Sequence, residues 1–107
     1  MDNAITMTVS FSQRATVAAD VLFRLVGNEA VLLNLKTELY LGLDATGTRM
    51  WTVLTSAPSI QSAYETLLQE YDVEPARLRQ DLDDFIGKLF EQSLVELHGE
   101  ELVAAGI

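Results

Sequence analysis

Residues 36–51 read KTELYLGLDATGTRMW, and the spacing of the apolar residues changes inside this stretch. Residues 39–43 (LYLGL) alternate with a period of two, which is typical of a β-strand. From Asp44 onward the spacing is helical, and Asp44 or Thr46 is suited to cap the N-terminus of a helix. A strand that leads directly into a helix is therefore predicted. The expected core positions of that helix are Met50, Trp51, Val53 and Leu54.

Two further apolar runs precede this stretch. Residues 21–26 (VLFRLV) end at the turn dipeptide Gly27-Asn28, and residues 29–37 (EAVLLNLKT) end at a second tight turn. Turns this short force neighbouring strands to run antiparallel, so residues 21–43 are predicted to form a three-stranded meander. Upstream, residues 5–11 (ITMTVSF) also alternate and predict a strand, whereas the small and polar residues 12–20 predict a loop.

Two more helices are predicted downstream. Pro58 ends the first helix, Ser59 caps the second, and Pro75 occupies the first turn of the third. The second helix has an apolar stripe made of Ile60, Ala63, Tyr64, Leu67, Leu68 and Tyr71. The third helix, residues 75–92, is expected to bury Leu78, Leu82, Phe85, Ile86, Leu89 and Phe90. Residues 94–97 predict a short extended segment, and residues 98–107 a flexible tail.

Three or four antiparallel strands followed by three helices predict an α+β domain of the winged helix-turn-helix type. Winged domains that bind DNA present a basic recognition helix. Here the net charge is −9, and the third predicted helix has fewer bases than acids (Arg77, Arg79 and Lys88 against Asp81, Asp83, Asp84 and Glu91). Such a surface repels phosphate groups, so nucleic acid is not expected as a partner.

The composition limits the class of protein further. A chain of 107 residues with 49% apolar content suits one domain, and the absence of cysteine rules out disulfides and thiolate metal sites. Neither a signal peptide nor a membrane span is visible, which predicts a soluble, cytoplasmic protein. We expect an N-terminal extension over residues 1–19, with a possible extra strand, and a folded domain over residues 20–97.

No catalytic constellation is apparent. His98 is the only histidine and lies in the predicted tail. Asp83 and Asp84 follow the pattern of a solvated helix face, whereas Asp81 lies at the edge of the apolar stripe, where a specific contact is possible. The glycines match no phosphate-binding motif. An enzyme, a metal site and a cofactor are therefore not predicted.

A binding surface remains. The strand over residues 39–43 carries neither charge nor proline, the devices that usually protect a sheet edge. Either residues 5–11 or a helix cover this edge, or it stays open and accepts a guest peptide as an added strand.

Several short motifs occur in a fixed order: Tyr40-x-Gly42-Leu43-Asp44-x-x-Gly47, then Trp51, then Gln69-Glu70-Tyr71-Asp72-Val73, and finally Asp81-Leu82-x-x-Phe85-Ile86. Together they resemble the PqqD-like family. The family comprises the RiPP recognition elements, small winged-helix domains that bind leader peptides of ribosomally made natural products. The resemblance covers about residues 20–97. Two departures are visible, because the family often has Asn at Asp44 and Gly in the turn at Ser93-Leu94.

The resemblance implies a peptide site between the third strand of the sheet and the third helix. The implied contact residues are Leu39, Tyr40, Leu41, Gly42, Leu43, Leu78, Asp81, Leu82 and Phe85. The implied function is non-catalytic delivery of a precursor leader peptide to a separate leader peptidase or other modifying enzyme. A lasso-peptide pathway is favoured over pyrroloquinoline quinone synthesis.

Two other readings stay open from the sequence. The chain could be an acidic winged-helix protein that acts by protein contact in transcriptional control. It could also be a scaffold subunit whose strand edge is a homodimer interface. The expected oligomeric state is a monomer, or a homodimer in which residues 5–11 are exchanged between the two copies.

Overall fold

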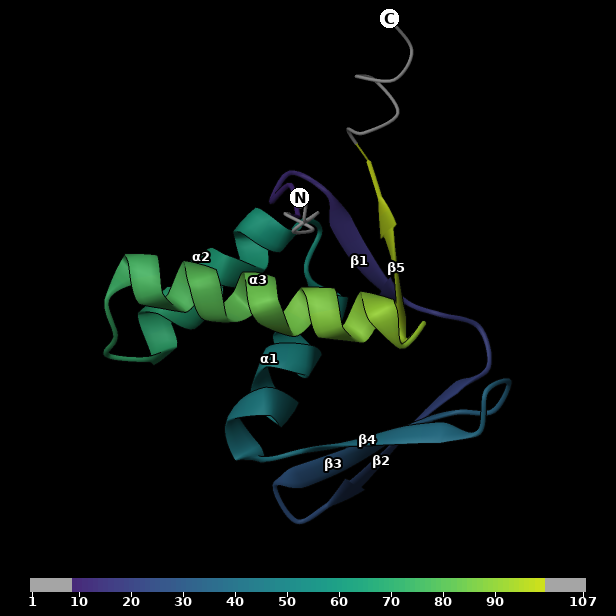
Figure 1. Ribbon diagram of the computed structural model, residues 1–107. Coiled ribbons are helices and arrows are strands. Elements are labelled where there is room, and N and C mark those ends of the chain that lie inside the picture. The colour runs from purple at the N-terminus through teal and green to yellow at the C-terminus, as the bar shows by residue number, and fades with distance from the viewer. Residues whose placement is uncertain (1–8, 100–107) are drawn as a thin grey trace, which may run out of the picture.

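The computed structural model describes residues 9–99, which form two antiparallel sheets and three helices (Figure 1). Along these residues the order is β1 Arg14–Val17, β2 Val21–Val26, β3 Glu29–Asn34, β4 Leu39–Leu43, α1 Ala45–Ser56, α2 Ile60–Glu70, α3 Pro75–Glu91 and β5 Val95–His98. The predicted α+β class is confirmed, and the arrangement is compatible with a winged helix-turn-helix. The strands belong to two sheets, one in the order β2-β3-β4 and the other made of β1 and β5.

The β2-β3-β4 sheet is the meander that the sequence predicted. In the turn between β2 and β3, Gly27 adopts a φ of +66°, a left-handed conformation that glycine enters without steric cost. Leu32 in the central strand lies opposite Phe23 of β2 and Leu41 of β4. α1 packs on β3 and β4, and Figure 1 shows it between this sheet and the other two helices. The sheet therefore has a helix-facing side and an outer side.

Residues 12–20 were predicted to be a loop, and this prediction is wrong for β1. Ala15 and Thr16 pair with Leu97 and Glu96 of β5, far away in the sequence. Only Ala15 is fully buried in this strand, so the short segment carries no clear alternating pattern. His98 belongs to β5, and its Nε2 lies 2.9 Å from the hydroxyl of Thr16. The rest of the predicted tail, residues 100–107, lies outside the described residues.

The predicted strand over residues 5–11 also falls mostly outside the described residues. Val9 and Phe11 lie within them and are buried, but neither belongs to a strand. The Val9 N–H donates to Asp83 Oδ1 at 3.1 Å, and the Arg79 guanidinium lies 3.9 Å from the centroid of the Phe11 ring. This cation–π contact and hydrogen bond attach the start of the described chain to α3.

The helix boundaries follow the predicted caps. Asp44 Oδ1 accepts from the Gly47 N–H at 2.8 Å, and Ser59 Oγ accepts from the Ser62 N–H at 3.0 Å. These bonds satisfy N–H groups that have no partner inside a first helical turn. Pro75 is the first residue of α3, where its missing N–H costs nothing.

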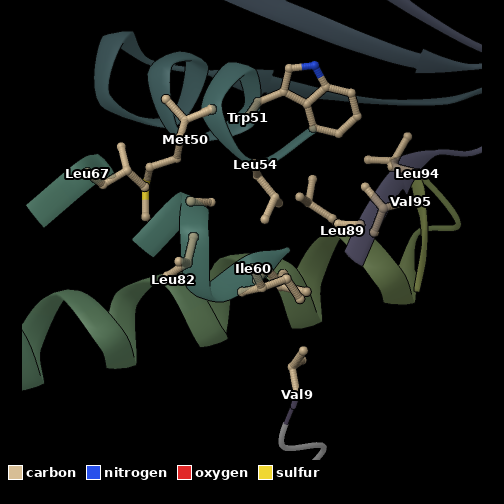
Figure 2. Close-up of a cluster of buried hydrophobic side chains, with 14 of the residues drawn as sticks. Val9, Met50, Trp51, Leu54, Ile60, Leu67, Leu82, Leu89, Leu94 and Val95 are labelled. Atoms are coloured by element: carbon tan, nitrogen blue, oxygen red, sulfur yellow. The ribbon is translucent and has the colours of Figure 1, made fainter. Parts of the chain in front are cut away.

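The core lies where the three helices meet the sheets. Figure 2 shows Leu54, Ile60 and Leu89 among the side chains that converge there. The four predicted core positions of α1 are all buried (Met50, Trp51, Val53 and Leu54). Phe90 was predicted to be buried but is 42% exposed, because it lies on the flank of the α3 stripe that Leu78, Leu82, Ile86 and Leu89 occupy.

α3 ends in a Schellman motif centred on Ser93, the position where the family often has glycine. Ser93 has a φ of +59°, its N–H donates to the Phe90 carbonyl at 3.0 Å, and the Leu94 N–H donates to the Leu89 carbonyl at 2.9 Å. The departure from glycine therefore leaves the helix end in its usual geometry, with a serine in left-handed backbone.

Candidate functional site

β4 forms one edge of the three-stranded sheet and, among the described residues, pairs only with β3. The hydrogen bonds at the start of the meander establish which backbone groups face this edge. The Leu35 N–H donates to the Asp20 carbonyl on the β2 side, whereas the Asn34 carbonyl accepts from the Glu38 N–H on the β4 side. Backbone groups alternate in direction along a strand, so those of Leu32, like those of Asn34, point toward β4.

The register of β4 against β3 then shows which backbone N–H and C=O groups of β4 point away from β3. Leu41 lies opposite Leu32 and forms the hydrogen-bonded pair with it. By alternation, the N–H and C=O groups of Tyr40 and Gly42 point away from β3, toward the open edge. The predicted open edge thus offers two donors and two acceptors in the geometry that an added strand requires.

Side chains on β4 also alternate between the two sides of the sheet. Leu39, Leu41 and Leu43 lie on the helix-facing side, and their exposure falls along the strand toward α1: Leu39 is 57% exposed, Leu41 is half-buried and Leu43 is 8% exposed. Tyr40, 74% exposed, lies on the outer side together with Gly42. The five predicted β4 residues are thus contiguous, but only Leu39 and Leu41 present accessible side chains toward the helices.

The four predicted α3 residues differ in accessibility. Leu78 is 6% exposed and Leu82 is fully buried, so both belong to the core. Asp81 is exposed, and its Oδ2 lies 3.5 Å from Arg77 Nε in an (i, i+4) ion pair. Phe85 is half-buried and packs against the same core cluster as Leu41. Phe85 and Asp81 are therefore the accessible members of this set.

Asn34 ties the sheet to the end of α3, and sequence reasoning did not single it out as a site residue. It is 3% exposed, its Nδ2 donates to the carbonyls of Gln92 and Ser93, and its Oδ1 accepts from the N–H groups of Lys36 and Thr37. All of these bonds are within 3.4 Å. Asn34 thus sets the distance between the β3–β4 turn and the C-terminal end of α3. The sequence did contain a signal for this role, because Asn34 is a polar residue within an otherwise apolar strand.

Two surface concavities adjoin the predicted residues. One, of about 320 Å³, lies on the sheet around Gly42 and is lined by Val26, Glu29, Ala30, Val31, Gly42, Leu43 and Asp44. The other, of about 520 Å³, lies at the start of α3 and is lined by Val73, Glu74, Arg77 and Asp81. The first exists in part because Gly42 has no side chain: a Cβ built there meets no atom within 4 Å.

The three aspartates on α3 have separate partners. Asp81 pairs with Arg77, Asp83 accepts from the Val9 N–H, and Asp84 accepts from Gln80 Nε2 at 2.9 Å. Within residues 9–99 no group of three acidic, histidine or cysteine side chains lies close enough to hold a metal ion. In the same part of the chain, no helix is both long enough and apolar enough to cross a lipid bilayer.

A two-bond ion pair between Arg49 and Glu70 joins α1 to α2. Arg49 Nε donates to Glu70 Oε1 at 2.8 Å, and a second bond joins its guanidinium to the other carboxylate oxygen. Hydrogen bonding to Arg49 lowers the pKa of Glu70, and the same bond raises the pKa of Arg49. This pair braces the two helices behind the sheet.

Among residues 9–99, β4 is thus a sheet edge with no second neighbouring strand, and α1 packs behind it. The sequence of residues 29–95 matches the family described as coenzyme PQQ synthesis protein D (PqqD), and the chain belongs to this family. The resemblance found in the motifs of the sequence is therefore confirmed. No curated protein matches the sequence significantly.

Two solved structures share the fold. TbiB1 in complex with the TbiA(β) leader peptide is 30% identical, with a TM-score of 0.72 over 79% of this chain and 99% of that chain. A lasso peptide synthetase B1 complexed with its leader peptide is 19% identical, with a TM-score of 0.70 over 78% of this chain and 98% of that chain. The second likeness shows the fold alone. Neither supports a role in transcription.

Proposed function

We propose that the protein binds the leader region of a ribosomally synthesised precursor peptide as an added strand on β4. It has no catalysis of its own in this proposal, and it delivers the precursor, in the cytoplasm, to a separate leader peptidase or other modifying enzyme. The observation that carries the proposal is the open edge, where the backbone groups of Tyr40 and Gly42 point away from β3. The likeness to TbiB1, whose structure contains a leader peptide, supports the proposal. Within it we favour a lasso-peptide pathway, as the sequence motifs implied.

The register of β4 predicts how the guest would lie. Guest residues opposite Tyr40 and Gly42 would exchange backbone hydrogen bonds with them and turn their side chains to the outer side. The guest residue opposite Leu41 would turn its side chain to the helix-facing side, because directly opposed residues share a face. An apolar side chain is expected there, since Leu41 and Phe85 are apolar and only partly covered.

The buried members of the predicted site have a supporting role in this proposal. Leu43, Leu78 and Leu82 have little or no exposed surface, so they hold β4 and α3 in place from within the core. Direct side-chain contact is assigned to Leu39, Leu41 and Phe85, and Asp81 provides a charged rim. Because backbone bonds are common to all peptides, the apolar contacts supply the selectivity.

The test is a calorimetric titration with the leader segment of a precursor encoded beside the gene. Leu41→Lys should weaken binding by about 1–3 kcal/mol, because it places a charge where an apolar anchor is desolvated. Val17→Lys is the matched control, since Val17 is 45% exposed and belongs to the other sheet. Circular dichroism should show that both variants are folded.

Two results would contradict the proposal. One is the absence of micromolar or tighter binding to any leader from the gene neighbourhood. The other is a folded Leu41→Lys protein that binds as tightly as the unmodified chain. Phe85→Ala extends the test to α3: it should weaken binding if Phe85 contacts the guest, and mainly lower the unfolding temperature if Phe85 serves only the core.

A further inference from the structure

β2 is the second edge strand of the sheet, and every residue in it except Arg24 is apolar. Among the described residues it pairs only with β3. Its side chains are nevertheless poorly covered: Phe23 is 42% exposed, Leu22 53%, Leu25 54% and Val26 69%. Exposed apolar residues are ordinary when scattered, but a whole apolar edge strand is a template for pairing with another chain.

The free backbone groups of β2 follow from one hydrogen bond. The Leu35 N–H donates to the Asp20 carbonyl at 2.8 Å, so the backbone groups of Asp20 point toward β3. By alternation along the strand, the N–H and C=O groups of Val21, Phe23 and Leu25 point to the open edge. The β2-β3-β4 sheet therefore leaves the backbone groups of these three alternate residues unpaired.

The strand lacks the usual protection against pairing. It contains no proline and no lysine, and its only charge is Arg24, on the outer side of the sheet. The helix-facing residues Val21, Phe23 and Leu25 are uncharged, so no inward-pointing charge would obstruct a neighbouring strand. Phe23 already stacks on Trp51, with ring centroids 6.4 Å apart and planes 8° apart, which fixes the middle of the strand.

We infer that β2 is a self-association edge, on which a second copy of this chain adds its own β2 in antiparallel orientation. In this arrangement a two-fold axis passes at Phe23, so Phe23 faces its counterpart and Val21 faces Leu25 of the second copy. In this register the free backbone groups of Val21, Phe23 and Leu25 in one copy bond those of Leu25, Phe23 and Val21 in the other. The interface is closed, because each copy uses the same surface, and assembly stops at the dimer.

The side chains suit a second copy. Arg24 lies opposite Leu22 of the other chain, and its diagonal neighbours are Asp20 and Arg24 of that chain. The two-fold axis therefore sets two Arg24–Asp20 attractions against one Arg24–Arg24 repulsion. The two Phe23 rings meet on the helix-facing side beside Trp51. Each copy carries a net charge of −9, which opposes association, so the dimer is weak and salt strengthens it. The combined six-stranded sheet ends in β4 at both sides, so two leader edges stay open.

Sedimentation velocity of the full chain over a range of concentrations tests the inference. We expect a reversible monomer–dimer equilibrium whose association is stronger at about 1 M salt than at about 0.01 M, because screening removes the long-range repulsion. Leu25→Lys should weaken self-association at least tenfold by placing an inward-pointing charge at the edge. Val17→Lys, an equally exposed apolar position on β1, should leave it unchanged.

Cysteine crosslinking tests the register. The chain has no cysteine, so a single Phe23→Cys substitution introduces one thiol per copy. Opposed residues of a hydrogen-bonded antiparallel pair have Cα atoms about 5.5 Å apart, within the range that a disulfide spans. Phe23→Cys should form a dimeric disulfide under mild oxidation, and Val17→Cys should not.

A chain that stays monomeric at every concentration and salt level would overturn the inference. So would a dimer that Leu25→Lys leaves intact and that Phe23→Cys fails to crosslink. The leader titration separates this inference from the proposed function: Leu25→Lys should abolish the dimer and keep leader binding, since β2 and β4 are opposite edges of the sheet.

Discussion

Asn34 in the meander and Ser93 at the end of α3 are 59 positions apart in sequence, and the side-chain amide of Asn34 donates to the Ser93 carbonyl at 3.1 Å. Because Asn34 also bonds the Gln92 carbonyl and the backbone of the β3–β4 turn, it is the point where β4 and α3 are held relative to each other. We therefore expect the position of β4 relative to α3 to depend on this contact.

Asn34→Ala should lower the free energy of unfolding by about 2–3 kcal/mol, because it removes four part-buried hydrogen bonds between the Asn34 amide and the backbone. It should also weaken leader binding in protein that remains folded. Urea denaturation measures the first effect and calorimetry the second. Asn34→Asp keeps the acceptor for the Lys36 and Thr37 N–H groups but removes the donors to Gln92 and Ser93. It therefore distinguishes the contribution of the turn bonds from that of the bonds to the end of α3. An unchanged stability in Asn34→Ala would show that the tie is not needed.

Ser93→Gly should stabilise the protein. Ser93 has a φ of +59°, and a non-glycine residue in left-handed backbone costs roughly 1–2 kcal/mol, part of which the greater chain entropy of glycine offsets. We expect the free energy of unfolding to rise by about 0.5–1 kcal/mol in thermal or urea denaturation. Ser12→Gly is a control at an exposed position outside any strand or helix. A loss of stability in Ser93→Gly would mean that the serine side chain makes a contribution larger than the strain.

Gly42→Pro should weaken leader binding about threefold to tenfold, because it removes an N–H that points to the open edge, and one hydrogen bond contributes about 0.5–1.5 kcal/mol. The β3–β4 ladder does not use this N–H, so the fold should remain. Gly42→Ala keeps the donor, and its Cβ meets no atom within 4 Å of the chain. Equal affinities for the two variants in the calorimetric titration would place the guest elsewhere.

The stability that Arg49–Glu70 contributes should depend on pH. The folded-state pKa of Glu70 is lowered by its hydrogen bond to Arg49, so the contribution is present above the ordinary carboxyl pKa and is lost as pH falls through the lowered value. At neutral pH, Glu70→Gln should melt below the unmodified protein, and the difference should shrink at about pH 3. Differential scanning calorimetry at the two pH values measures this. A difference that grows on acidification would contradict the assignment.

Much of the fold was predictable because its signals are local. The alternation in residues 39–43, the caps at Asp44 and Ser59, and the stripe of α3 each involve neighbouring residues. β1 was not predictable in the same way, because Ala15 acquires its strand conformation from Leu97 at the other end of the chain. No local pattern reports a pairing over that distance.

Residues 39–43 were predictable as a strand, but which of their side chains are accessible was not. Sequence pattern and family resemblance placed the edge at residues 39–43, yet they grouped the core residues Leu78 and Leu82 with the accessible Phe85. Only the packed structure distinguishes a side chain that is buried in the core from one that is accessible on the surface. Asn34 was missed for a related reason: it joins the adjacent β3–β4 turn to the distant end of α3 through four bonds to backbone groups.

The direction of the Tyr40 and Gly42 backbone groups has a consequence for how the precursor gene can change. Every amino acid supplies the same N–H and C=O groups, and the side chains opposite these two residues would be directed to the outer side of the sheet. Mutations at those alternate codons of the leader would be nearly silent for recognition. One copy of this domain could therefore serve several diverged precursors, provided that each retains its apolar residue opposite Leu41.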